Sequence, residues 1–441
     1  MTDLAILGGR PVRTKTFSSR PLIGEDERRF ISECLKERSF SRFIGSPVGD
    51  FRDRLAMDSK SAASLEEFWS VLGGPYVRRF EAEFASKHQV SFAVSMNSAT
   101  SCLTAAVLAC GLNPGDEIIT TPFSFTATAT ALYAAGAKVV FADIDPNTYC
   151  LDPQSVLDNI TERTRAVVPV HILGNGGHFI EIEGICREKG LIIIEDSAQA
   201  LRCKLGGRYL GSLGAVGVFS FQETKNIMTG EGGMAITNDQ ETAYRLRLIR
   251  NHGEAMVFDD DPAERIASAV GYNFRLPEVL AAVGYGQVLK LERVNQIRRE
   301  NYLVLSKELE AFSFLRPQKV MNDPGQFFPY CIGFRYDSET LGLNRDLFAE
   351  ALRAEGIPVS TGFPRLLSEN LLFHTESGET PVAKRINYEE YLGFFQIGYP
   401  NKPKDMEQIA KGIKKIADHK EELISRAGEF TVSREFNSGR I

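Results

Sequence analysis

Between residues 90 and 240, short apolar runs alternate with stretches that have the spacing of helices. The runs of four to six apolar residues predict strands at SFAVSM, GDEIITTP, AKVVFADI, TRAVVPVHI, LIIIED, GAVGVFSF and GGMAIT. The stretches ATSCLTAAVLACGL and FIEIEGICREKG between them are predicted to be helices. Continuous apolar strands that alternate with helices are typical of a sheet covered on both faces. The pattern therefore predicts an α/β domain with a mostly parallel central sheet.

The pattern changes after about residue 285. One long helix is predicted over residues 285–312, followed by the strand PYCIGFRYD and the helices RDLFAEALRAEG and DMEQIAKGIKKIADHKEELISRA. We therefore expect a smaller α+β C-terminal domain. The predicted division places an N-terminal arm and the large domain in residues 1–290. It places the bridging helix, the small domain and a tail in residues 291–441.

Residues 46–70 interrupt the N-terminal region with a segment of mixed polarity. Loop statistics favour an ordinary loop for this insertion. A disordered insert and an active-site flap are the alternatives.

Composition excludes several classes of protein. The 441 residues are 43% apolar and 24% charged, as in an ordinary globular protein, and the net charge of -6 argues against a nucleic-acid partner. No apolar run is long enough for a membrane span, so we expect no membrane partner. The seven cysteines contain no CxxC pair and the six histidines no paired spacing, so we expect neither disulfides nor a metal site. A cytoplasmic location is the simplest interpretation.

Candidate chemistry begins at the end of the predicted strand LIIIED, which closes with Glu195 and Asp196. A carboxylate is costly to bury unless a cation or hydrogen bonds compensate, so an acid at this place suggests a role. The alternative for Asp196 is a helix N-cap, which aspartate favours.

The stretch FSFQETKNIMTGEGG places Lys225 between a predicted strand and a loop with three glycines. At the carboxyl end of a strand, its amine faces the same crevice as Asp196 and can attack an aldehyde. Ser220 lies five residues earlier, where its hydroxyl can hold a phosphate, and the glycines allow close backbone approach. An exposed loop lysine is the alternative.

Two further segments complete the set. Asn97, Ser98 and Thr100 lie where a predicted strand becomes a helix, which gives either an anion site or a simple N-cap. Phe125 follows the strand GDEIITTP and is interpreted either as a ring that stacks on a flat ligand or as a core residue. An amine, an acid, a phosphate site and a stacking ring together meet the requirements of pyridoxal 5'-phosphate.

At these residues the chain resembles the DegT/DnrJ/EryC1/StrS sugar aminotransferases, a branch of the fold-type I pyridoxal-phosphate enzymes. The resemblance extends from AILGGRPV to about residue 420. Its motifs, in the order of the family, are GGPYVRRFEAEFA, NSATSCL, NPGDEIITTPFSFTATATAL, FADIDPNTYCLDP, VVPVHILG, IIEDSAQA, SFQETKNIMTGEGGMAITND, RNHG and GYNFRLPEVLAA. It implies an aspartate-aminotransferase-like (fold type I) large domain and pyridoxal 5'-phosphate as the cofactor.

The resemblance also implies roles for matching residues. Lys225 looks like the catalytic lysine that forms a Schiff base with the cofactor and moves a proton. Asp196 looks like the partner of the pyridine nitrogen. Gln199 resembles the residue beside the 3'-oxygen of the cofactor, and Phe125 resembles the stacking ring. The residues that resemble the phosphate site are Ala99, Thr100 and Ser220.

Four more residues are predicted to lie at the site. Asn273 resembles a residue that reaches the phosphate from the neighbouring subunit, which implies a homodimer with shared active sites. His171 of VVPVHILG, Arg275 of GYNFR and Arg365 are predicted substrate contacts. The stretch TGFPRLLSENLLF replaces a segment that in the family contains tyrosine and histidine. Arg365, which lies in this stretch, is interpreted either as a contact to a substrate anion or as a solvated side chain.

The resemblance implies an aminotransferase that moves an amino group from L-glutamate or L-glutamine to a keto-sugar. A nucleotide-linked sugar is favoured, for amino-sugar, polysaccharide or antibiotic synthesis. Some dehydratases of the family carry histidine instead of lysine, so Lys225 favours transamination. The stretches LGLNRDLFAEALR and NTYCLDP are similar to glutamine-dependent keto-cyclitol aminotransferases, which is the alternative acceptor class. A non-catalytic cofactor-binding regulatory protein and a pyridoxal-phosphate lyase or desulfurase are alternatives of other classes.

Overall fold

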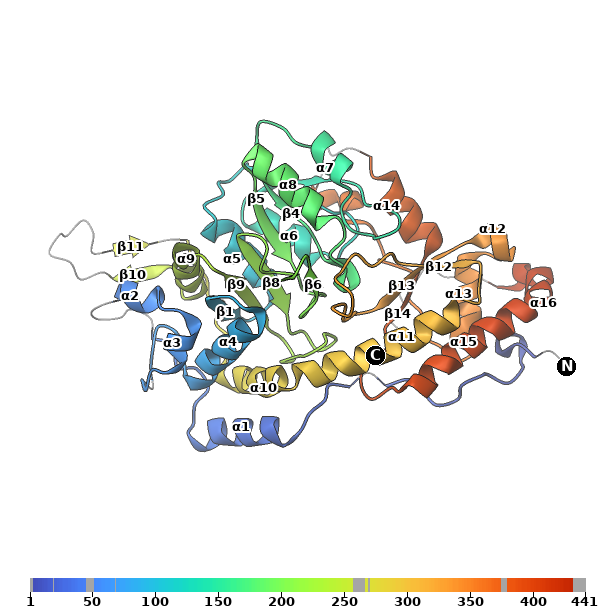
Figure 1. The fold of residues 1–441 in the computed structure, drawn as a ribbon, viewed down its shortest axis with the longest axis horizontal. Coiled ribbons are helices and arrows are strands. Elements are labelled where there is room, and N and C mark those ends of the chain that lie inside the picture. The colour runs from blue at the N-terminus through green and yellow to red at the C-terminus, as the bar shows by residue number, and fades with distance from the viewer. Residues whose placement is uncertain are drawn as a thin grey trace.

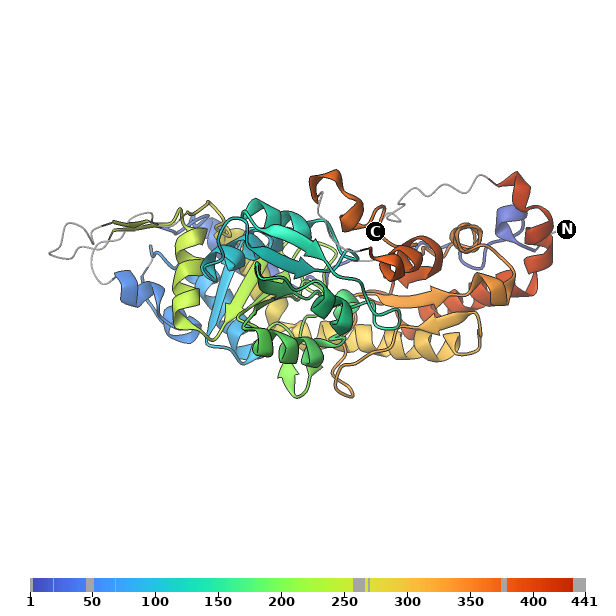
Figure 2. The same cartoon turned by 90° about the horizontal axis from the view of Figure 1, so that it is seen from above.

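The protein has two parts that lie one after the other along its long axis (Figure 1, and from above in Figure 2). The structure is a computed structural model that describes residues 3–18, 20–44, 51–67, 69–256, 266–268, 270–373 and 379–430. One part is built on a seven-stranded sheet and the other on a three-stranded sheet. The predicted fold class is confirmed.

The central sheet has the strand order β1-β9-β8-β5-β4-β2-β3. Its neighbours from β8 to β3 are parallel, whereas β9 is antiparallel to both β1 and β8. The strands of this sheet are β1 (Phe92–Met96), β2 (Glu117–Thr120), β3 (Lys138–Phe141), β4 (Thr164–Val168), β5 (Ile192–Asp196), β8 (Val216–Ser220) and β9 (Gly233–Thr237). All seven predicted strands form. Every residue of β1, β2 and β9 is buried, which explains their continuous rather than alternating apolar pattern.

Helices cover both faces of this sheet. The α-helices are α1 (Glu25–Lys36), α2 (Phe51–Leu55), α3 (Ser59–Ala63), α4 (Pro75–His88), α5 (Ala99–Ala109), α6 (Ala127–Ala134), α7 (Pro153–Asp158), α8 (Phe179–Lys189), α9 (Gln240–Arg250), α10 (Glu278–Leu289), α11 (Leu291–Leu309), α12 (Ser338–Leu341), α13 (Arg345–Ala354), α14 (Pro381–Arg385), α15 (Pro403–Asp418) and α16 (Lys420–Ser425). Val216 and Val218 of β8 pack in a cluster with residues of α5, α6 and α9. Phe219, on the opposite face, packs with α4 and α10. Successive residues of one strand therefore serve two cores.

The single helix predicted over residues 285–312 is wrong, because α10 and α11 are separated at Lys290. The Lys290 amine donates to the carbonyl of Leu22 (2.9 Å) and forms an ion pair with Glu27 of α1. Lys290 is therefore held by the N-terminal region at the point where the helix breaks. No proline, the residue that most often breaks a helix, is present in this stretch. Beyond the break, α11 runs from the central sheet to the second part of the molecule (Figure 1).

The second part is an antiparallel sheet covered by helices. Its strands are β12 (Leu315–Pro317), β13 (Ile332–Tyr336) and β14 (Tyr391–Phe394). Phe334 of β13 packs with residues of α11, α13 and α15, and Leu4 from the N-terminal arm joins the same cluster. The first residues of the chain therefore lie against this second part. The division of the chain at residue 290 stays a prediction. The N-terminal arm was assigned to the first side of this division, but it packs on the second part of the molecule.

The insertion at residues 46–70 is not an ordinary loop over its described residues. It contains the short helices α2 and α3, and Leu55 and Ala62 are buried in a small cluster with Leu72 and Leu248. The Ser59 hydroxyl accepts a hydrogen bond from the backbone N–H of Ala93 (2.8 Å). The insertion therefore packs against the start of β1 and against α9.

Two short hairpins lie outside these sheets, formed by β6 (Lys204–Leu205) with β7 (Arg208–Tyr209) and by β10 (Glu254–Met256) with β11 (Ile266–Ser268). No helix within the described ranges has both the length and the apolar character that a membrane crossing requires. Most of the predicted tail lies beyond residue 430, outside the described residues.

Candidate active site

Asp196 ends β5 with its carboxylate inside the protein. The residue is 4% exposed, and its carboxylate accepts hydrogen bonds from Thr128 Oγ1 (2.8 Å) and from the backbone N–H of Ala198 (3.2 Å). Turns rather than a helix follow it, so the N-cap alternative is wrong. Burial raises the pKa of the Asp196 carboxyl, while these hydrogen bonds and the charges of Lys225 and His171 oppose the rise.

Lys225 lies on the loop that follows β8, the parallel neighbour of β5. Because parallel strands end at the same edge of a sheet, this loop emerges beside Asp196. The loop folds back, since the Thr229 N–H donates to the carbonyl of Phe221 (2.8 Å), and Gly230 takes the left-handed conformation with φ +88°. Lys225 is half-buried and is not the exposed lysine of the alternative interpretation.

The predicted anion site lies at the start of α5. Ser98 caps this helix, because its hydroxyl accepts a hydrogen bond from the N–H of Ser101 (3.0 Å). An α-helix leaves its first N–H groups without partners inside the helix, and its N-terminus carries partial positive charge. The N–H groups of Ala99 and Thr100 therefore have no partner inside the helix, and their role in holding a phosphate stays a prediction.

Gly233 of β9 brings this helix start close to the sheet. A Cβ atom at residue 233 would lie 2.4 Å from the carbonyl carbon of Ser98 and 2.5 Å from the nitrogen of Ala99. Only glycine permits so close an approach without a shift of the backbone. Gly233 also pairs with Ser220 at the end of β8, which brings Ser220 beside the helix start.

Glu195, next to Asp196, is held by four donors. It accepts hydrogen bonds from His171 Nε2 (2.8 Å) and, at 2.7 Å each, from the backbone N–H groups of Gly211, Leu213 and Gly214. His171 is only 1% exposed, so the structure offers its ring to Glu195 rather than to a substrate. The predicted direct substrate contact of His171 is therefore not formed. His171 instead holds Glu195, the residue next to Asp196, inside the protein.

Gln199 lies three residues beyond Asp196 at the same edge of the sheet. Its side-chain oxygen accepts a hydrogen bond from the backbone N–H of Leu173 (2.8 Å). Thr128 was missed from the sequence, although its hydroxyl is a direct partner of Asp196. The Ser124 hydroxyl lies 2.9 Å from that of Thr128 and extends the chain of hydrogen bonds.

Phe125 lies between β2 and α6 and is 67% exposed. The interpretation as a core residue is therefore wrong. Phe123, two residues earlier, is buried and packs edge-on to Phe363 with 5.0 Å between ring centres. One segment thus presents a core ring and an exposed ring, and the exposed ring leaves a face for a flat ligand.

We expect Phe125→Ala to weaken cofactor binding without weakening the fold. Because its ring has little protein to pack against, the free energy of unfolding should change by no more than about 0.5 kcal/mol. Loss of a stacked ring should raise the dissociation constant for pyridoxal phosphate about tenfold. Equilibrium titration and thermal unfolding measure the two effects. The control Phe123→Ala should cost roughly 3–5 kcal/mol of stability, and a similar loss for both variants would contradict the stacking role.

Asn273 and Arg275 lie together at the end of β1. Arg275 donates to the side-chain oxygens of Asn273 (3.0 Å) and Asn251 (3.3 Å), and the Asn97 N–H donates to the carbonyl of Phe274 (2.8 Å). The Asn273 residue is exposed, so its amide is open to a ligand or to another chain. The cofactor role of Asn273 and the substrate role of Arg275 stay predictions.

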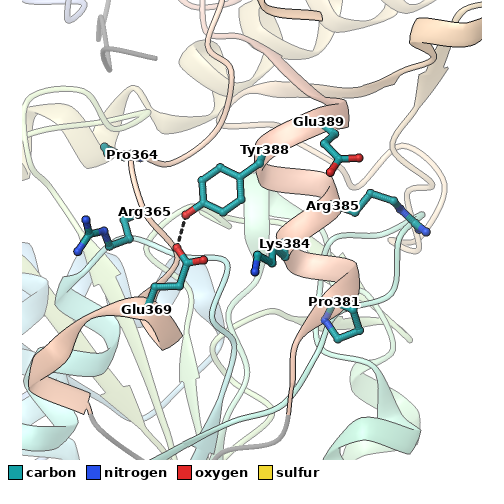
Figure 3. A pocket seen from close by; sticks show the side chains of 8 residues that line it. All are labelled: Pro364, Arg365, Glu369, Pro381, Lys384, Arg385, Tyr388 and Glu389. Carbon is teal, nitrogen blue, oxygen red and sulfur yellow. Dashed lines mark hydrogen bonds between the residues drawn. The ribbon is translucent and has the colours of Figure 1, made fainter. Parts of the chain in front are cut away.

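Arg365 lines a different pocket, about 600 Å³ in volume, which contains neither Lys225 nor Asp196. The residues that line it are Pro364, Arg365, Glu369, Pro381, Lys384, Arg385, Tyr388 and Glu389 (Figure 3). Arg365 is exposed and extends away from Tyr388, whose hydroxyl donates to Glu369 (Figure 3). A contact between Arg365 and a substrate anion also stays a prediction.

The gathered residues fit pyridoxal 5'-phosphate. Asp196 is a buried carboxylate able to face a protonated ring nitrogen, and Lys225 is an amine at the same sheet edge. Because Gly233 has no side chain, the start of α5 lies directly against the end of the neighbouring strands. Phe125 supplies an exposed aromatic face.

Fold and site together define a fold-type I pyridoxal-phosphate enzyme. The chain belongs to the DegT/DnrJ/EryC1/StrS aminotransferase family, whose model matches residues 56–392. It is an aminotransferase whose cofactor is pyridoxal 5'-phosphate.

Proteins similar to this chain carry several different names, as two relatives and one solved structure show. The chain is 34% identical over 319 residues to the pleiotropic regulatory protein of Geobacillus stearothermophilus, covering 71% of this chain and 82% of that one. It is 33% identical over 411 residues to an L-glutamine:2-deoxy-scyllo-inosose aminotransferase of Streptoalloteichus tenebrarius, covering 86% and 95%. The solved structure of DesI in the presence of its TDP-sugar product is 28% identical with a TM-score of 0.80, covering 97% and 99%.

Proposed function

We propose that this aminotransferase moves an amino group from L-glutamate or L-glutamine to a keto-sugar, with a nucleotide-linked sugar as the favoured acceptor. The observation that carries the proposal is the meeting of Lys225 and Asp196 at the ends of two neighbouring parallel strands. The likeness to DesI, which was solved with a TDP-sugar product, supports this acceptor class.

Each residue at the site has a separate role in the proposed reaction. Pyridoxal phosphate, when bound, supplies an electron sink for the carbon that loses a proton. Lys225 would form the covalent link to it, and its Nζ, once released, would remove the proton from the α-carbon of the amino donor. Asp196 would hold a proton on the ring nitrogen. Ala99 and Thr100, with Ser220, would bind the phosphate.

Two further residues orient the ring in this proposal. Phe125 would stack on it, and Gln199 would lie beside its 3'-oxygen. The hydrogen bond from the Leu173 N–H supports the role of Gln199, because it fixes the amide at the sheet edge near Asp196.

An absorption spectrum tests the first half of the reaction. The protein with pyridoxal phosphate should be yellow, and the band should bleach when L-glutamate or L-glutamine is added. The bleached protein should then recover its colour with a nucleotide-linked keto-sugar and release an amino-sugar, detected by mass spectrometry. A band that responds to no amino donor would contradict transamination.

A keto-cyclitol is the second candidate acceptor. The chain covers 95% of the scyllo-inosose aminotransferase of Streptoalloteichus tenebrarius, so no large segment of that relative is unmatched. Comparison of kcat/KM for scyllo-inosose and for a nucleotide-linked keto-sugar distinguishes the two. A preference of more than tenfold for the cyclitol would overturn the sugar assignment.

Two other classes are disfavoured by particular observations. A desulfurase needs an accessible thiolate, but burial raises the pKa of the Cys203 and Cys331 thiols to about 12. A regulatory protein that binds DNA is disfavoured by the net charge of -6. Binding of a DNA fragment at moderate salt would revive the regulatory interpretation.

We also propose a cytoplasmic homodimer with shared active sites. The exposed Phe125 ring and the exposed Asn273 amide support it, since each lies at the site without being covered by its own chain. The seven cysteines form no disulfide, which suits the cytoplasm. Light scattering should give twice the mass of one chain, and fractionated cells should carry the protein in the cytoplasm. A monomer that is fully active would contradict the shared site.

A further inference from the structure

The amine of Lys225 lies over an aromatic ring from the other part of the molecule. Its Nζ is 4.3 Å from the centre of the Tyr330 ring. Within the described part of the chain the amine has no hydrogen bond or ion pair, so this ring is its partner. A cation over the face of an aromatic ring is attracted by the negative charge of that face.

The hydroxyl of Tyr330 is already engaged. The Thr224 hydroxyl donates its proton to Gln222 Oε1 (2.6 Å), so in the 2.9 Å contact between Tyr330 and Thr224 the tyrosine must be the donor. Thr224 and Gln222 belong to the same loop as Lys225. The loop therefore fixes the hydroxyl end of the ring and leaves the face of the ring for the amine.

The backbone of Tyr330 is fixed as well. Its N–H donates to the carbonyl of Leu173 (3.1 Å), and its carbonyl accepts from Arg298 of α11 (3.0 Å). Phe395 packs edge-on to the ring, with 5.4 Å between ring centres. Tyr330 lies between α11 and β13, so the C-terminal part of the chain supplies a ring to the site on the central sheet.

We propose that Tyr330 is a positioning residue that holds the amine of Lys225 over its ring whenever the amine is not covalently linked. The inference rests on the proposed role of Lys225. A transaminase releases this lysine in the first half-reaction and links it again only at the end of the second, and in between a flexible four-carbon side chain would otherwise move away from the reacting carbon. The ring keeps the free amine at the sheet edge, beside Asp196.

The test measures the amine directly, in the full-length chain freed of cofactor. An acylating reagent must reach the nitrogen of the amine, so a ring that holds the amine over its face protects Lys225 from the reagent. Tyr330 is replaced by phenylalanine, which keeps the negative ring face, and by pentafluorophenylalanine, which has nearly the same shape without it. Peptide mass spectrometry then gives the rate of acetylation at residue 225.

We expect Tyr330→Phe to behave like the wild type and the fluorinated ring to speed acetylation of Lys225 by about threefold to thirtyfold. Lys204 is the internal reference, because its Nζ lies 4.2 Å from the ring centre of Tyr209 and should react equally in all three proteins. Equal rates at Lys225 with the two replacement rings would overturn the inference, since the ring would then only fill space.

A second experiment distinguishes an error in the role of Tyr330 from an error in the role of Lys225. Borohydride reduction of the wild-type protein with pyridoxal phosphate should fix the cofactor on residue 225. If another residue is labelled, the role of Lys225 is wrong and the inference falls with it. If Lys225 is labelled but ring fluorination has no effect, only the role of Tyr330 is wrong.

Discussion

Lys225→Ala should abolish turnover while leaving the protein folded. The lysine is proposed both to bind the cofactor and to move the proton, and removal of a covalent catalyst costs at least about 10⁴-fold in kcat. Among the described residues the amine has no hydrogen bond or ion pair, and its contact with the Tyr330 ring is worth on the order of 1 kcal/mol, so the unfolding temperature should change little. Steady-state rates with L-glutamate and an acceptor, together with thermal unfolding, provide the measurement.

Lys204→Ala is the matched control for this variant, because it removes a lysine over another ring and should retain wild-type turnover. The two-chain proposal adds a stricter test. If Asn273 serves the neighbouring site, Lys225→Ala and Asn273→Ala chains mixed in one dimer should recover activity at the one site that keeps both residues. Sustained transamination by Lys225→Ala alone would refute the catalytic role.

The central sheet was predictable because its strands are buried on both faces and therefore appear as continuous apolar runs. Asp196 and Lys225 were predictable for a related reason, since Asp196 ends one such run and Lys225 lies in the loop that follows another. Neither residue needed knowledge of distant contacts. Residues that act at the end of a strand are thus visible from local pattern.

Residues that act across the fold were not visible in this way. Thr128 lies in the segment TATATA, where three threonines alternate and only the folded helix shows which one meets Asp196. Tyr330 is more than one hundred positions from Lys225 and belongs to no motif with it. At the helix break, Lys290 contacts Leu22 and Glu27, which are far from it in the sequence, so no local pattern indicates these contacts.

The insertion at residues 46–70 was misjudged for a physical reason as well. Helices of five residues are too short to show helical periodicity, and such helices are marginal without tertiary contacts. Here those contacts come from Leu55 and Ala62, which pack on the large part of the molecule. The predicted contact of His171 failed because its partner, Glu195, is inside the protein as well.

Asp196→Asn should lower turnover while leaving the protein folded. Without a carboxylate to hold a proton on the ring nitrogen, turnover should fall on the order of a thousandfold. The amide can still be accommodated, because the hydroxyls of Ser124 and Thr128 can reverse their donor and acceptor roles. Thr128 would then accept from the introduced amide and donate to Ser124.

The cofactor-free variant should nevertheless be more stable than the wild type at neutral pH. Burial raises the pKa of the Asp196 carboxyl, so the folded chain binds this proton more readily than the unfolded chain does. The resulting stability is present below the ordinary carboxyl pKa and is lost as pH rises through the raised value. Asparagine does not ionise, so the advantage of the variant should grow between pH 4 and pH 8 in thermal unfolding experiments.

Asp239→Asn is the control for this pH dependence. Hydrogen bonds from Thr242, at the start of α9, lower the pKa of the Asp239 carboxyl, so the sign is opposite. Asp239 contributes stability above the ordinary carboxyl pKa, and that contribution is lost as pH falls through the lowered value. Asp239→Asn should therefore be no more stable than the wild type at neutral pH. If Asp196→Asn is also no more stable than the wild type at neutral pH, the buried Asp196 carboxylate does not destabilise the cofactor-free protein. Asp196 would then be a structural residue whose hydrogen bonds fully compensate its burial, and a protonated ring nitrogen would not be needed to stabilise it.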